Sequence, residues 1–224
     1  MVSVVSRQVD FSDKPKYRTE INLTRFKDQG VEYERLMRYT GPEHFVAAAV
    51  DRAGRRAFLT PARPPVVYVA DFQSNKKPVP TPWLELEESA SISSLHYDQT
   101  TDQLYATDGL GSRLFAVDTK SPDPRPQVVA QSLGVPTRIA GGPTGERLYV
   151  ADSEGLQVWS IDCAGVGECS TPEVFVRDEA FSNLSDLVVA PDGTVWVGDI
   201  EAQRIFGFNA DGQLEQMYAE LPPH

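Results

Sequence analysis

The chain has 224 residues, of which 41% are hydrophobic, and 21 basic against 32 acidic side chains give it a net charge of −11. This length allows one substantial core, so a single domain over residues 1–224 is expected. The acidic balance argues against nucleic acid and anionic membranes as partners, because their phosphates would be repelled. No apolar run approaches the ~20 residues that a bilayer span requires.

Residues 1–44 hold two stretches that predict strands, at 19–26 and 33–39, around a turn at 27–30. No complete repeat is found in this segment. We therefore expect it to form the outer half of a partial blade, or strands that close a ring.

From residue 45 onward one pattern of short strands repeats about every 45 residues. An apolar stretch ends at positions 61, 108, 152 and 199, and a second one ends ten residues later each time. Gly- and Asp-containing turns separate the strands. A period of roughly 40–50 residues made of short strands is typical of a β-propeller with one four-stranded blade per repeat. The predicted blades cover residues 45–88, 89–133, 134–181 and 182–220.

The sequence therefore predicts an all-β propeller with four recognisable four-stranded blades and a partial fifth. A five-bladed ring with one incomplete blade, a closed four-bladed ring and a reduced form or fragment of a six-bladed ring all fit the pattern. An incomplete ring would expose strand edges, and pairing of those edges predicts a homo-oligomer.

The two cysteines, Cys163 and Cys169, flank a Gly-containing loop that follows an apolar strand of the third repeat. A disulfide across so short a loop is sterically feasible, and two unpaired thiols are the alternative. A disulfide would favour a secreted or periplasmic location. The first residues do not have the pattern of a signal peptide.

Three motifs carry a resemblance to a known group of propellers. They are Gly41-Pro-Glu43, Pro191-Asp-Gly-Thr-Val-Trp-Val-Gly-Asp199 and Arg204-Ile-Phe-Gly-Phe208. They resemble motifs of six-bladed lactonases and esterases, a group that includes the senescence-marker-protein/gluconolactonase, paraoxonase and strictosidine-synthase-like proteins. The strand pattern, from residue 41 to 212, is also similar to that of NHL-repeat propellers.

The resemblance implies a calcium ion in the central tunnel, held by oxygen ligands that precede several inner strands. Glu43 and Asp186 match carboxylate ligands, whereas Ser93 and Thr137 stand where the family has asparagine. Steps of 44 to 50 residues indicate that these four residues hold equivalent places in successive blades. We predict Glu43 and Asp186 as ligands of a divalent cation, and Ser93, Thr137 and Arg138 as residues that bind a small-molecule ligand. Two alternatives remain: a Glu43–Arg138–Asp186 charge network that replaces the ion, and simple hydrogen bonding at strand starts.

Three residues are candidates for catalysis. His44 and His96 are predicted as general bases, with a purely structural histidine as the alternative. Asp108, Asp152 and Asp199 recur at the ends of second strands, where an aspartate normally caps the following loop. Asp152 lies in the segment most similar to the family, so it is kept as a catalytic candidate.

These residues, together with the resemblance, predict a lactonase- or esterase-like hydrolase that acts on a small molecule at the axial end of the propeller. A divalent cation would polarise the carbonyl group. The alternatives are a non-catalytic propeller that binds a small ligand or a protein, and a metal-independent biosynthetic enzyme that uses the tunnel as a shaped pocket.

Overall fold

The computed structural model of the protein describes residues 2–10, 14–27, 30–61, 63–72, 78–88, 90–165 and 167–219. Its regular elements within these ranges are nineteen β-strands. The described part of the chain has no helix with the length and apolarity to cross a bilayer.

Four antiparallel sheets of four strands follow one another along the chain. The first two contain β4 (Phe45–Asp51), β5 (Arg56–Pro61), β6 (Val66–Asp71) and β7 (Thr81–Glu85), then β8 (Ile92–Asp98), β9 (Gln103–Asp108), β10 (Arg113–Asp118) and β11 (Gln127–Gln131). The last two contain β12 (Pro136–Gly141), β13 (Arg147–Asp152), β14 (Gln157–Asp162) and β15 (Glu173–Arg177), then β16 (Leu184–Val189), β17 (Val195–Asp199), β18 (Arg204–Phe208) and β19 (Leu214–Ala219).

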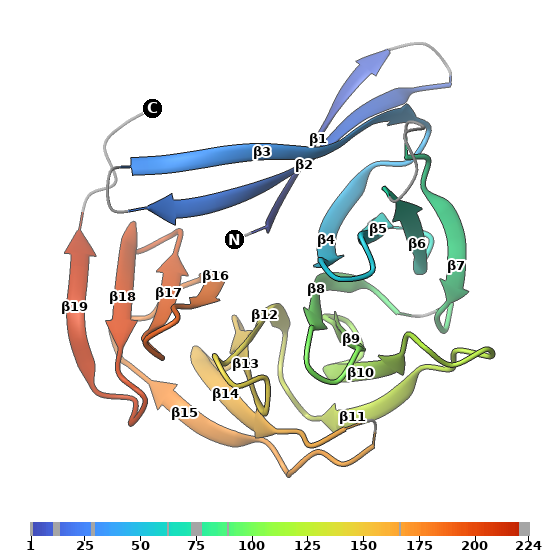
Figure 1. The fold of residues 1–224 in the computed structure, drawn as a ribbon. Coiled ribbons are helices and arrows are strands. Elements are labelled where there is room, and N and C mark those ends of the chain that lie inside the picture. Colours follow the sequence, from blue (N-terminus) through green and yellow to red (C-terminus); the bar gives the residue numbers. More distant parts are fainter. Residues whose placement is uncertain are drawn as a thin grey trace.

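The sheets stand around a centre that is lined by their first strands. β4, β8, β12 and β16 surround this centre (Figure 1), and each contacts the next one along the chain. This is the arrangement of propeller blades, so the predicted all-β propeller with four blades and a partial fifth is confirmed.

The N-terminal sheet differs from the prediction. It has three strands in the order β1 (Val2–Asp10), β2 (Lys16–Lys27) and β3 (Gly30–Gly41), and β1 contacts β4. β1 thus stands beside the inner strand β4, and the predicted strands at 19–26 and 33–39 fall within β2 and β3, which follow β1 in the sheet order. β1 was missed because Ser, Arg and Gln interrupt its alternation. The predicted turn at 27–30 includes residues 28 and 29, which lie outside the described residues.

The core consists of apolar layers between neighbouring sheets rather than one central mass. Second strands lie in the middle of these layers, and every residue of β9 is buried. Outer strands bury one residue each, namely Leu84, Ala130 and Val176, which are at most 9% exposed. The residue in the same register position of the last blade is Tyr218, and it is 58% exposed. No further sheet of the described chain covers that face, although the hairpin β2–β3 extends towards β19 (Figure 1). Assembly of copies through exposed blade edges stays a prediction.

Candidate functional site

Each inner strand carries a β-bulge close to its start. The pairing of β8 with β9 skips Ser93, that of β12 with β13 skips Thr137, and that of β16 with β17 skips Ser185. A bulge places two residues opposite one and turns a side chain in a new direction. The residue equivalent to Ser93 and Thr137 is therefore Ser185, and Asp186 is instead equivalent to Arg138. The predicted equivalence of Glu43, Ser93, Thr137 and Asp186 was wrong, because the step between blades varies with loop length and spacing cannot resolve a difference of one residue.

The hydroxyl groups of Ser93 and Thr137 join neighbouring blades. Ser93 Oγ donates to the carbonyl of Pro136 at 2.6 Å, and Thr137 Oγ1 donates to the carbonyl of Leu184 at 2.9 Å. Both acceptors lie on the inner strand of the following blade. These hydroxyls therefore hold the axial ends of β8, β12 and β16 together, and their part in ligand binding stays a prediction.

Arg138 and Asp186 face each other at this axial end. Arg138 Nε lies 3.6 Å from Asp186 Oδ1, and the two side chains are 41% and 71% exposed. Arg138 Nη1 donates to the carbonyl of Thr137 at 2.9 Å and to that of Ser93 at 3.4 Å. The guanidinium is thus oriented by two blades, while an accessible carboxylate stands beside it. We call Ser93, Thr137, Arg138 and Asp186 the axial site.

Glu43 is held in a different environment. Tyr39 donates its hydroxyl to Glu43 Oε2 at 3.0 Å. Burial and this hydrogen bond raise the pKa of Tyr39 to about 12, and burial together with the Glu43 charge raises the pKa of Tyr68. Tyr39 belongs to β3 and Tyr68 to β6, the third strand of its blade. The described contacts of Glu43 therefore lie between two sheets, and none of them joins it to Asp186.

The axial donor set does not fit a calcium ion. Calcium requires six to eight oxygen ligands. In the described part of the chain, His, Cys, Asp and Glu side chains do not gather in groups of three or more that could hold a metal ion. The guanidinium of Arg138 beside Asp186 adds a positive charge where a cation would bind. Arg138 thus faces Asp186 as in the alternative charge network, but no described contact brings Glu43 into that network.

The two candidate histidines lie apart. His44 is exposed, and its ring stacks on that of Tyr17 with the centroids 4.8 Å apart. His96 packs between β8 and β12 against Gly141, and its ring is stacked on Tyr105 at 6.4 Å. Burial lowers the pKa of His96 to about 4. No described contact links either ring to Asp186, and their roles as general bases stay predictions.

The recurring aspartates cap loops, as expected. Asp199 accepts hydrogen bonds from four backbone N–H groups, those of Ser182, Asn183, Glu201 and Ala202, at 2.6–3.1 Å. Burial alone would raise the pKa of Asp199, but these four donors lower it below its ordinary value.

Asp152 is bound in the same way. It is 1% exposed and accepts hydrogen bonds from three backbone N–H groups and from the side chains of Gln157 and Trp159. These contacts account for its position by loop anchoring, and a catalytic role for it stays a prediction.

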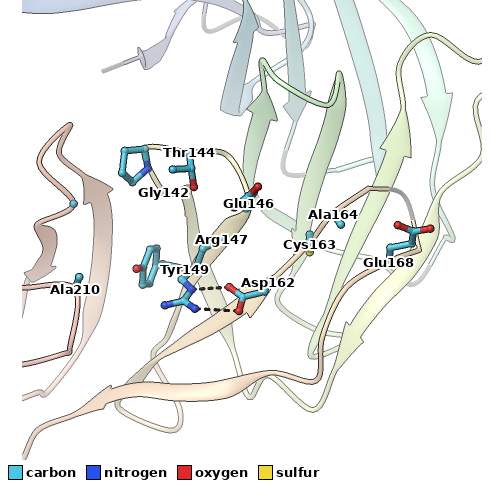
Figure 2. A pocket seen from close by; sticks show the side chains of 12 residues that line it. Gly142, Thr144, Glu146, Arg147, Tyr149, Asp162, Cys163, Ala164, Glu168 and Ala210 are labelled. Atoms are coloured by element: carbon cyan, nitrogen blue, oxygen red, sulfur yellow. Dashed lines mark hydrogen bonds and ion pairs between the residues drawn. The ribbon is translucent and has the colours of Figure 1, made fainter.

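A cavity of about 530 Å³ lies at the opposite ends of the strands, between the third and fourth blades. Figure 2 shows Arg147 and Asp162 paired at its wall, with Nε–Oδ1 and Nη2–Oδ2 distances of 2.6 and 3.0 Å. Cys163 also lines it and forms the predicted disulfide with Cys169, which is confirmed. The sequence held no signal for this cavity, because residues from two different blades line it.

The family follows from a match between the chain and a family model. The model described as the SMP-30/Gluconolactonase/LRE-like region matches residues 101–222, which is more than half of the chain. The chain belongs to the SMP-30/gluconolactonase/LRE-like family. The match begins in the second blade and includes Thr137, Arg138 and Asp186 of the axial site.

Solved structures extend the likeness of this SMP-30/gluconolactonase-like chain to nearly its full length. A gluconolactonase from Xanthomonas campestris is 11% identical with a TM-score of 0.64, over 92% of this chain and 73% of that one. A putative 6-phosphogluconolactonase from Bacteroides uniformis is 14% identical with a TM-score of 0.61, over 91% and 67%. A virginiamycin B lyase from Staphylococcus aureus is 13% identical with a TM-score of 0.65, over 100% and 76%. Such low identities establish the shared propeller fold alone. A search of curated proteins found no match.

Proposed function

We propose that the protein is a hydrolase that opens a lactone, or cleaves a related ester, at the axial site. The observation that carries the proposal is the Arg138–Asp186 pair, which places an accessible carboxylate beside a fixed positive charge at the mouth of a propeller. The family and the lactonase-like neighbours support the same class of reaction.

Asp186 is suited to the role of general base. Its Oδ1 accepts the backbone N–H of Leu187 at 2.9 Å, which leaves Oδ2 without a partner among the described residues. In the proposed step, Asp186 takes a proton from a water molecule as the water oxygen bonds to the acyl carbon. The acyl carbon–oxygen bond then breaks, and the leaving oxygen takes the proton back. The products are a hydroxy acid from a lactone, or an acid and an alcohol from an ester, and no step is assigned to a metal ion.

The test is a titration of acid release from glucono-δ-lactone, γ-butyrolactone and phenyl acetate. Replacement of Asp186 by Asn is expected to lower kcat by about 100-fold, the usual size of a general-base effect. Asp192→Asn, in the exposed turn between β16 and β17, is the matched control and should leave kcat unchanged. Loss of activity in His44→Gln or His96→Gln, with Asp186→Asn still active, would instead assign the base to a histidine.

A non-catalytic propeller that binds a small ligand is the second candidate. The observation in its favour is that the hydroxyls of Ser93 and Thr137 are already used in hydrogen bonds between blades. Binding of a lactone to the wild-type protein without acid release would support this candidate against the hydrolase.

A further inference from the structure

The guanidinium of Arg138 belongs to a side chain that is 41% exposed, and one of its edges has no close partner. Its Nη1 is used by the carbonyls of Thr137 and Ser93. Its Nη2 has no hydrogen-bond partner in the described part of the chain. Its Nε faces Asp186 Oδ1 at 3.6 Å, which is beyond ordinary hydrogen-bond distance. The Nε–Nη2 edge is therefore held in place but not occupied by a strong partner.

Three other arginines show what an occupied edge looks like. Nε and Nη2 of Arg147 bind Asp162, those of Arg56 bind Asp51, and those of Arg113 bind Asp108 and Glu87. All six donor–acceptor distances lie between 2.6 and 3.0 Å. Arg138 differs from these in that its own carboxylate neighbour lies too far away to complete the fork.

The free edge has the geometry that recognises an oxyanion. Two parallel N–H groups of a guanidinium match the two oxygens of a carboxylate. Asp186 competes only weakly with such an oxyanion for the guanidinium, because ion pairs between exposed side chains contribute little free energy. Phosphate shares this chemistry, but it carries nearly twice the charge. Among the described residues, only one guanidinium stands here, Asp186 lies beside it, and the protein has a net charge of −11. A singly charged carboxylate therefore suits the site better than a phosphate does.

We propose that Arg138 binds a carboxylate group of the substrate through its Nε–Nη2 edge, so that the preferred substrates are lactones or esters that carry a separate carboxylate. The inference rests on the proposed hydrolase function. With the carboxylate held by Arg138, the reacting carbonyl group lies on the side where Asp186 can direct a water molecule. Arg138 thus determines substrate specificity, while Asp186 performs the chemistry.

The experiment compares γ-butyrolactone-γ-carboxylate with its methyl ester, which has the same ring without the charge. Lactone-ring opening is followed by chromatography, so that cleavage of the methyl ester is counted separately. We expect the wild type to favour the carboxylate by about tenfold in kcat/KM, the effect of one charge-assisted fork at a partly exposed position. Arg138→Gln should remove this preference, so that the ratio of kcat/KM for the carboxylate to kcat/KM for the methyl ester falls to about one. Arg125→Gln, in an exposed loop, is the matched control and should keep the preference for the carboxylate.

A direct binding measurement makes the result independent of turnover. Isothermal titration with the same carboxylate should show affinity in the wild type, loss in Arg138→Gln and a gain of a few-fold in Asp186→Asn, because that change removes the competing charge. The gain in affinity comes together with a loss of kcat. A thermal melt checks that each variant is folded.

The outcomes separate the two proposals. Binding that depends on Arg138 without any ring opening would overturn the hydrolase and support the carboxylate site. Equal opening of both compounds, with Arg138→Gln no different from wild type, would overturn the carboxylate site and support the hydrolase. Tighter binding of inorganic phosphate than of the carboxylate, lost in Arg138→Gln, would overturn the choice of carboxylate.

Discussion

His96 is expected to make the protein less stable as the solution becomes acidic. Burial lowers the pKa of its imidazole from 6.5 to about 4, and the charge of Asp98 opposes this only in part. The ring fills the space that a side chain at Gly141 would need. Tyr105 stacks on it from the neighbouring strand, and the side chain of His96 is half-buried.

The size of the effect follows from the difference in proton binding. Between pH 6.5 and about 4 the unfolded chain binds a proton at this position and the folded chain does not. The free energy of unfolding therefore falls with decreasing pH by about 1.4 kcal/mol per unit. The expected loss from His96 is about 3 kcal/mol in total. The full stability is present above pH 6.5 and is lost progressively towards pH 4.

The assay is urea unfolding of the wild type and of His96→Gln at several values between about pH 7.5 and about pH 4. The wild type should lose about 3 kcal/mol more than the variant across this window. His44→Gln is the matched control, because His44 is exposed, and it should follow the wild type. Identical pH dependence in the wild type and His96→Gln would refute the reasoning.

Four further changes test other parts of the structure. Asp199→Asn should cost roughly 1–3 kcal/mol in urea unfolding, because buried backbone N–H groups lose a charged acceptor; a smaller loss than that of Asp192→Asn would contradict this. Gly207→Ala should lower the free energy of unfolding by about 1–3 kcal/mol, since a Cβ there would lie 2.7 Å from the Trp196 ring. Gly165→Ala is the control and should have little effect, because a Cβ at that position would meet no atom within 4 Å. Calcium or EDTA should leave the melting temperature unchanged, and a shift of several degrees that is lost in a Glu43→Gln/Asp186→Asn double variant would show that a metal site exists. Replacing both cysteines by serine should lower the free energy of unfolding by roughly 2 kcal/mol, because the disulfide closes a short loop and restricts the unfolded chain. An unchanged free energy of unfolding would argue against this contribution.

Local chemistry made much of the fold predictable from the sequence. Strand alternation and Gly- or Asp-containing turns act over a few residues, so the predicted strands of the four blades fall close to the observed ones. The capping role of Asp108, Asp152 and Asp199 was predictable for the same reason, because a carboxylate at the end of a strand reaches the N–H groups of the next loop. The disulfide joins residues only six positions apart.

The axial site depended on contacts between residues far apart in the chain. The bulges at Ser93, Thr137 and Ser185 mark equivalent positions, and they match Asp186 with Arg138 rather than with Thr137. Spacing alone could not show this, because the step between blades varies by several residues with loop length. Glu43 is an exception, because its partner Tyr39 is only four residues earlier in the chain, across the connection from β3 to β4. The sequence was sufficient for the repeated blade because each blade is built from neighbouring segments. Which polar side chains meet at the axis depends on how the curved sheets pack around it, and that is a property of the assembled ring.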